Sequence, residues 1–388
     1  MQDDTEEWAL EAPKMASIYN GAIVTISATS AVSGHDGLFN TKSSRALSHD
    51  SGLEIAIETR LLHGGRSVLR FGRQHSGRTM LQAWRANVLD APLLQRAWVC
   101  QERMSSPRII HYTSAQIFWE CEHCMLSEDN IIVSSETASS DRKARSFFLT
   151  LYSSMILKNW GWHHWYAALV EYQYSRCNLT FKQDKLIAIS GLAKLINDKT
   201  TVPYFAGHWY SNEHEFLNSL YWARESAGVK TCDYRAPSWS WASQDSATGF
   251  YVDNNESYHS RIMHLYVEPK APATSSFGLL SGGGVVVEGP LLSCRLEYVS
   301  YTSRTGLWSN AGTRYTNYHL LDNDTEPPIG TIAQALALTS GRNVYFLILS
   351  TVEHDTCTMK RIGLGIINVQ LDWAQQLLRA PLTRVRII

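Results

Sequence analysis

The sequence has few of the features that mark membrane, secreted or nucleic-acid-binding proteins. Its 388 residues contain no run of about 18 apolar residues, so no transmembrane helix is expected. The N-terminus is acidic and polar, without the basic and apolar segments of a signal peptide. Because 35 lysines and arginines nearly balance 36 aspartates and glutamates, no net field would attract nucleic acid or an anionic membrane.

Cysteine is sparse as well. The seven cysteines are an odd, scattered set, which is typical of reduced thiols in an intracellular protein, so we expect a cytoplasmic location. With 44% hydrophobic residues, the chain is long enough to bury a real core and to form two or three domains. The 13 tryptophans and 18 tyrosines are interpreted mainly as large core side chains.

The periodicity of apolar residues predicts a mixed α/β protein. Helical spacing runs from Trp8 to Ala22, with a kink or a new helix at Pro13. The β-branched segment 22–28 then predicts a strand. Further expected elements are strands at 53–57 and 67–71, a helix from Ala91, a hairpin of 109–112 with 117–121, and helices over about 147–195 and 213–227.

The character of the sequence changes after residues 235–243. Beyond them, short alternating segments separated by glycine predict a β-rich module over 246–388. Its strands are expected at 285–287, 291–298, 344–349 and 364–369.

Five sequence blocks, taken together and in order, resemble those of fungal heterokaryon-incompatibility (HET) domain proteins. In the first block, Glu7 stands where the family usually has aspartate before Trp8. The third block matches the family's Arg-Gly-Trp-x-x-Gln-Glu pattern, with Ala97 in the position of the glycine. The blocks are residues 7–28, 37–39, 96–102, 174–193 and 235–243.

The resemblance implies an organisation of the chain. The family's domain usually opens with a Leu-Ser-Tyr-x-Trp-Gly segment and an Arg-Tyr-x-Trp-x-Asp-x-x-Cys-Ile-x-Gln stretch, and residues 2–4 look like the tail of the latter. We therefore expect the C-terminal part of a HET domain at 1–105, with a partial TIR-like, doubly wound α/β fold. A mainly helical HET-associated region at 106–245 and the β-rich module at 246–388 would follow.

The resemblance also suggests a catalytic residue. HET domains have been likened to TIR domains, some of which cleave the nicotinamide bond of NAD with a glutamate just after a tryptophan. Here Trp8 and Glu11 have that relation. Such a carboxylate could stabilise an oxocarbenium-like transition state or bind the ribose hydroxyls. The simpler interpretation is that Glu11 favours the helix N-terminus and that Trp8 packs.

The third block supplies further candidates. Arg96 and Glu102 could form a bidentate ion pair that fixes a helix. The alternative for Arg96, Trp98, Gln101 and Glu102 is binding of a partner or a nucleotide.

Two other patterns favour structure over chemistry. Cys121 and Cys124 with His111 could suggest zinc, but one Cys-x-x-Cys without a second paired set is poor evidence, and no metal site is expected. The aromatic cluster at 160–166, with His163 and His164, is more typical of helix packing than of a stacking site for a sugar or base.

Three functions follow from the resemblance. The first is self/non-self recognition in filamentous fungi, in which the protein promotes regulated cell death together with an unknown protein partner, or as a homo-oligomer. The second is an NAD-cleaving hydrolase that uses Glu11, with NAD as a substrate and no cofactor. The third is a non-catalytic or degenerate interaction module, which the incomplete HET domain favours. A carbohydrate-active enzyme fits less well, because no convincing pair of catalytic carboxylates is present.

Overall fold

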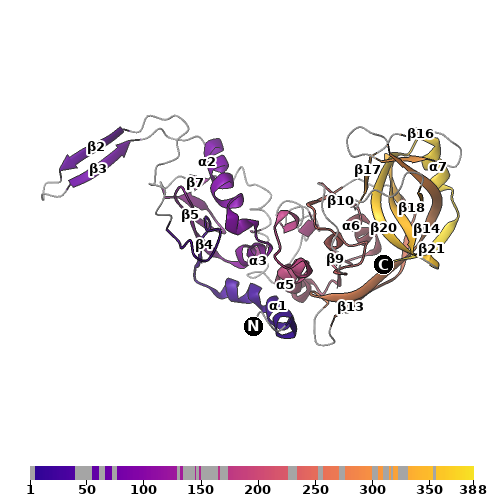
Figure 1. Ribbon diagram of the computed structural model, residues 1–388, viewed down its shortest axis with the longest axis horizontal. Helices are drawn as coiled ribbons and strands as arrows, with labels where there is room; N and C mark the ends of the chain where they lie inside the picture. The colour runs from indigo at the N-terminus through magenta and orange to yellow at the C-terminus, as the bar shows by residue number, and fades with distance from the viewer. Residues whose placement is uncertain are drawn as a thin grey trace.

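A computed structural model gives the architecture of most of the chain (Figure 1). It describes residues 5–39, 55–60, 66–71, 77–128, 132–133, 145, 148–149, 165–166, 174–225, 234–251, 257–270, 276–298, 305–308, 314–315, 318–321, 331–352 and 355–388. An α/β unit built from the N-terminal residues and a large β-sheet built from the C-terminal residues lie at opposite ends, with a region of short elements between them. No helix in these ranges is long and apolar enough to cross a bilayer.

The N-terminal unit packs helices against a small sheet. Helix α1 (Thr5–Gly21) runs through Pro13 as one helix and leads into strand β1 (Thr25–Ser27). The five-stranded sheet has the order β1-β4-β5-β6-β7, in which β1 and β4 are parallel and the other pairs are antiparallel. The remaining elements are β2 (Ile55–Arg60), β3 (Arg66–Phe71), α2 (Gly77–Trp84), a π-helix (Arg85–Leu89), a 3-10 helix (Pro92–Gln95), α3 (Ala97–Ser105), β4 (Arg108–Tyr112), β5 (Ile117–Cys121), β6 (Met125–Ser127) and β7 (Ile132–Val133).

The middle region is made of short elements around buried tryptophans. Trp209, Trp222, Trp239 and Trp241 are all almost completely buried, and each belongs to one large hydrophobic cluster. The elements are 3-10 helices (Tyr174–Arg176, Lys182–Lys185, Ile187–Ile189 and Trp241–Ser243), α5 (Ser190–Thr200), β8 (Tyr204–Phe205), β9 (His208–Trp209), α6 (Glu213–Ser219), β10 (Trp222–Arg224) and β11 (Thr248–Phe250).

The C-terminal strands form a ten-stranded, mainly antiparallel sheet around the long strand β14. Its elements are β12 (Ser257–Tyr258), β13 (Arg261–Pro269), β14 (Leu280–Tyr298), β15 (Thr305–Trp308), β16 (Arg314–Tyr315), β17 (Tyr318–Leu321), β18 (Ile332–Ser340), β19 (Asn343–Val352), β20 (Asp355–Asn368), α7 (Asp372–Leu378) and β21 (Leu382–Ile387).

Both faces of this sheet are covered. Phe346 and Ile348 of β19 pack in a cluster with Trp373 of α7, whereas Leu347 and Leu349 join the tryptophan-rich cluster of the middle region. Alternate residues of one strand therefore contribute to two cores, which explains the uninterrupted apolar runs at 335–338 of β18 and 344–349 of β19. The larger core also spans the predicted domain boundary at residue 245.

The mixed α/β class predicted from the sequence is confirmed, as are β1 and the β4–β5 hairpin. The doubly wound, TIR-like arrangement is not confirmed, because β1 and β4 are the one parallel pair among the described strands of this unit. One helix prediction needs correction, because helix α6 ends at Ser219 and β10 follows within the range expected to be helical.

Other expectations fall partly outside the described residues. Of the helix expected over 147–195, the later part forms short 3-10 helices and the start of α5. In the aromatic cluster, Trp165 and Tyr166 are buried, and His163 and His164 lie outside the described residues.

Candidate functional site

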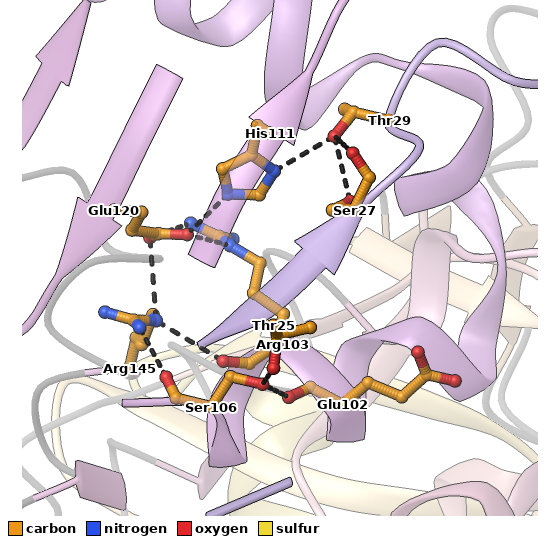
Figure 2. A network of polar contacts seen from close by, with 9 residues as sticks. All are labelled: Thr25, Ser27, Thr29, Glu102, Arg103, Ser106, His111, Glu120 and Arg145. Atoms are coloured by element: carbon orange, nitrogen blue, oxygen red, sulfur yellow. Dashed lines mark hydrogen bonds and ion pairs between the residues drawn. The ribbon is translucent and has the colours of Figure 1, made fainter. Parts of the chain in front are cut away.

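The most concentrated set of polar side chains in the N-terminal unit lies between α3 and the sheet (Figure 2). Strand alternation places Ile109, His111, Phe118 and Glu120 on the buried face of β4 and β5. Two of these four inward residues are polar, and Glu120 is the acceptor around which the network is arranged.

Two arginines approach the Glu120 carboxylate. Arg103 of α3 donates from Nε to Oε2 at 2.9 Å and from Nη2 to Oε1 at 2.6 Å, which is a bidentate pair with both side chains buried. Nε of Arg145 lies 3.7 Å from Oε1 of the same carboxylate. Trp84 contacts the edge of this cluster, 6.0 Å from the Arg103 guanidinium to the ring centre.

His111 connects the carboxylate to two hydroxyl groups. Its Nε2 lies 3.0 Å from Glu120 Oε2, and its Nδ1 lies 3.1 Å from Thr29 Oγ1. Thr29 Oγ1 is in turn 2.9 Å from Ser27 Oγ. With Glu120 ionised, Nε2–H of His111 donates to the carboxylate, so Nδ1 accepts from Thr29 and the Ser27 hydroxyl donates to Thr29.

The pKa values agree with this assignment. Burial of the Glu120 carboxyl would raise its pKa, but Arg103 and Arg145, with hydrogen bonds from His111 and Arg103, hold that pKa well below its usual range. Burial lowers the pKa of His111, against the opposing effect of Glu120, and the two arginines lower it further. At neutral pH the network therefore contains an anionic Glu120 and a neutral His111.

A second set of hydrogen bonds fixes the end of α3 against β1. Ser106 Oγ donates to the Glu102 carbonyl oxygen at 2.8 Å and lies 2.8 Å from Thr25 Oγ1. Arg145 donates from Nε to the carbonyl oxygen of Arg103 at 3.3 Å. The network thus joins β1, α3, β4, β5 and Arg145 into one unit.

Thr29, His111 and Glu120 place a hydroxyl, an imidazole and a carboxylate in series, as in the catalytic triads of hydrolases. In such triads the imidazole takes the proton of a hydroxyl that attacks a substrate. The exposed fractions of Thr29, His111 and Glu120 are 0%, 1% and 1%, so a substrate has no access to the hydroxyl. The geometry instead supports a structural role for these side chains. Their hydrogen-bonded ion pairs fix the relative positions of β1, α3, β4 and β5.

The Trp8 and Glu11 candidates lie on α1, away from this network. Glu11 is exposed, with its side chain 48% accessible, and it pairs with Lys14 at 2.7 Å. The side chain of Trp8 lies outside the described residues. The structure therefore puts Glu11 on a solvated helix surface, where a neighbouring lysine one turn away is its partner.

The candidates on α3 are brought together with α1 and the middle region. Gln101 is fully buried and bridges two helices, since its Nε2 donates to the Ala12 carbonyl at 3.3 Å and its Oε1 accepts from the Gly191 amide at 2.8 Å. Trp98 Nε1 donates to Asp184 Oδ2 at 3.2 Å.

Glu102 and Arg96 differ from the expected bidentate pair. The hydrogen-bond partner of the Glu102 carboxylate is Tyr19 of α1, and Arg96 is exposed and acts on Glu102 through its charge. Burial raises the pKa of Glu102, against the opposing effects of Tyr19 and Arg96. Arg96 instead joins the next block through its backbone, in a parallel bridge with Asn178.

The two later blocks also fold against each other. Arg235 donates to the carbonyl oxygens of Ala242 and Lys182, and it pairs with Asp245 at 2.6 Å. Lys185 is buried, donates to the Gln244 carbonyl and lies over the Trp241 ring. Blocks that are far apart in the sequence are therefore neighbours in the core.

Sequence reasoning missed Arg103, Arg145, Thr29 and Ser27 as members of a network. The local pattern did not mark His111 and Glu120 either, because Ile110, Tyr112, Trp119 and Cys121 make the opposite face of the predicted hairpin the more apolar one. His111 is turned toward Glu120 and Thr29, on the face opposite to Cys121. It does not join the cysteines as the zinc hypothesis required.

Comparison with known proteins gives one match. The family model described as "Heterokaryon incompatibility protein (HET)" matches residues 1–102. Neither the curated proteins nor the solved structures contain a match to the chain. The matched segment ends within α3, one residue before Arg103, so the described unit continues beyond it through β4 and β5. Residues 1–102 are therefore similar to the heterokaryon-incompatibility family, as the sequence blocks within this segment predict.

Proposed function

We propose that this chain acts in heterokaryon incompatibility, as a signalling protein of self/non-self recognition in filamentous fungi that promotes regulated cell death. The observation that carries the proposal is the family match over residues 1–102. The proposed effector unit consists of this segment and the strands that complete its sheet, held together by the network around Glu120.

The arrangement of the family's residues favours action through protein contacts rather than through catalysis. Gln101 and Glu102 of the third block bond to α1, and Trp98 bonds to Asp184. These side chains are used to assemble the unit and to attach it to the middle region. We propose that the assembled surface is what a protein partner recognises.

The alternative, an NAD-cleaving hydrolase, depends on Glu11. A carboxylate that stabilises an oxocarbenium-like transition state works best in a site that excludes water. Glu11 is about half exposed and paired with Lys14. This geometry gives the alternative less support than the signalling role, and the two make opposite predictions for one substitution.

The test is expression of the chain and its variants in a fungal host, with cell viability and cellular NAD measured together. We expect the parent chain and Glu11→Gln to reduce viability equally, with no difference in NAD between them. Lys14→Gln is the matched control, because it removes the same ion pair but keeps the Glu11 carboxylate. Viability and NAD that recover in Glu11→Gln alone would establish the hydrolase instead.

A third variant separates folding from chemistry. Glu120→Gln removes the buried charge that holds α3 on the sheet, and we expect it to abolish the effect on viability. Immunoblotting at matched expression level accompanies each variant. Normal growth with the parent chain at verified high expression would overturn the proposed function.

A further inference from the structure

The end of the β5–β6 hairpin places two cysteines side by side. Cys121 is the last residue of β5 and Cys124 directly precedes β6. The Cys121 amide donates to the Cys124 carbonyl at 2.9 Å, so the two residues face each other across a two-residue turn. Directly opposed residues of a hairpin project on the same face, and the two Sγ atoms are 3.6 Å apart.

These thiols are accessible. Both cysteines are half-buried, and Cys121 lines a cavity of 320 Å³ between α1 and the sheet. Arg108, which is paired directly with Cys121 across β4 and β5, lines the same cavity. Glu122 and His123 of the turn also contribute to its wall. A cation and a carboxylate therefore stand beside a thiol in a space that a small molecule could enter.

The environment of Cys121 favours its thiolate. Burial would raise the pKa of Cys121, but hydrogen bonds from the backbone of Cys124 and His123 and from the side chains of Trp119 and Cys124 lower it overall. The thiolate is the form of cysteine that attacks disulfides. By contrast, burial raises the pKa of Cys100, Cys177 and Cys294.

We propose that Cys121 and Cys124 form a redox-active dithiol that exchanges with small zwitterionic disulfides of the glutathione type. Arg108 would bind a carboxylate of the disulfide and Glu122 its ammonium group. This site goes beyond the proposed function and does not depend on it.

The exchange proceeds in two displacements. The Cys121 thiolate attacks one sulfur of the disulfide, which forms a mixed disulfide with Cys121 and releases the other half as a thiolate. Cys124 then loses its proton, and its thiolate attacks Cys121 Sγ, which forms the Cys121–Cys124 bond and releases the second half. The two cysteines are oxidised by two electrons, the small disulfide is reduced to two thiols, and the two cysteine protons end on those thiols.

The geometry permits the internal bond. A disulfide has a sulfur–sulfur distance of about 2.05 Å, so the two Sγ atoms must approach by about 1.5 Å, which side-chain rotation can supply. Among the described residues, no cluster of three or more metal-ligating side chains includes these cysteines. A dithiol is therefore the chemistry that this hairpin supports best.

The first experiment uses the whole chain without substitution. The protein is incubated with oxidised glutathione, quenched with iodoacetamide, digested and analysed by mass spectrometry. We expect a Cys121–Cys124 disulfide to form first. Separately, iodoacetamide should modify Cys121 faster than the exposed Cys357, because the lowered pKa of Cys121 enlarges its thiolate fraction and the cavity leaves its Sγ accessible. Equal alkylation rates without a Cys121–Cys124 disulfide would overturn the proposal.

Two variants test the order of steps and the role of Arg108. Cys124→Ser should accumulate a glutathione adduct on Cys121, because the second displacement is blocked. Arg108→Gln should slow the reaction with oxidised glutathione but not with the neutral hydroxyethyl disulfide. If Arg108→Gln and the parent chain reacted with oxidised glutathione at equal rates, Arg108 would not be part of the site. If the Cys124→Ser variant formed a glutathione adduct on Cys357 but not on Cys121, the dithiol itself would be refuted.

Discussion

Replacing Glu120 with glutamine should destabilise the N-terminal unit more than any exposed substitution nearby. Glutamine keeps the size of the side chain but removes the carboxylate charge with which the buried Arg103 and Arg145 pair. Breaking a buried pair in this way costs about 3–5 kcal/mol. Because whole proteins are stable by only about 5–15 kcal/mol, this is a large fraction of the free energy of unfolding.

Amide hydrogen exchange measured by mass spectrometry locates the effect. Peptides from α3 and the β4–β5 hairpin (residues 97–121) should exchange more than about a hundredfold faster in Glu120→Gln, since 1.4 kcal/mol corresponds to about tenfold in an equilibrium constant. Peptides from α7 serve as the internal reference, because Trp373, Ala374 and Leu377 pack in a core that contains none of residues 97–121.

Two comparisons make the prediction decisive. Glu122→Gln removes an exposed carboxylate two residues away and should change stability by less than about 0.5 kcal/mol. The double variant Arg103→Gln/Glu120→Gln should lose less than the sum of the two single variants, because their partners are shared. If Glu120→Gln exchanged as slowly as Glu122→Gln, the network would not hold the unit together.

The ion pairs of Glu120 also make the stability of the N-terminal unit depend on pH. The folded pKa of Glu120 is depressed well below its ordinary value of 4.5, as burial is outweighed by the two arginines and by hydrogen bonds from His111 and Arg103. Its contribution to stability is therefore complete above about pH 4.5 and is lost as the pH falls toward the folded pKa. After correction for the intrinsic exchange rate at each pH, acid should lower the protection of amides in residues 97–121 of the parent chain, and Glu120→Gln should show less of this dependence.

Two further substitutions probe the contacts between units. Gly191→Ala should destabilise the chain by about 1–3 kcal/mol in urea denaturation, because the added Cβ would lie 2.8 Å from Ala16 Cβ and 3.0 Å from the Pro13 carbonyl oxygen. The control is the exposed substitution Lys194→Ala. A urea midpoint of Gly191→Ala equal to that of the control would contradict the close packing of α1 and α5. Burial, and to a lesser extent the charge of Arg235, lowers the pKa of Lys185 from 10.5 to about 7. Between these two pH values the unfolded chain binds more protons than the folded chain. The free energy of unfolding therefore rises with pH in this range, by up to about 1.4 kcal/mol per pH unit. Lys185→Met should flatten this rise between about pH 7 and pH 10, and equal slopes in the two proteins would show that Lys185 is not desolvated.

Local patterns predicted the local structure of the chain. The β-branched run at 22–28 and the alternation of 109–112 and 117–121 are properties of adjacent residues, and both appear as strands. The helix expected over 213–227 fails after Ser219, where Trp222 packs into the core as part of β10. Burial of this large side chain against the C-terminal sheet outweighs helical spacing, and no local pattern reveals that partner.

In the candidate site, the sequence likewise identified single residues but not their distant partners. Gln101 and Trp98 were recognisable as family residues, but their partners Gly191 and Asp184 are more than 80 residues away in sequence. Long-range partners depend on how helices cross, which a single sequence does not encode in any local spacing. Arg145 joins Glu120 in the same way, from a position for which the sequence offered no structural prediction.

We propose that the chain promotes cell death through an assembled, non-catalytic unit, and expression of Glu11→Gln tests this proposal most directly. Viability and cellular NAD should be compared in cells that express equal amounts of the parent chain, Glu11→Gln and Lys14→Gln. We expect all three to kill cells equally, because Glu11 is an exposed residue paired with Lys14. Survival and restored NAD with Glu11→Gln alone would contradict the claim and assign Glu11 a catalytic role.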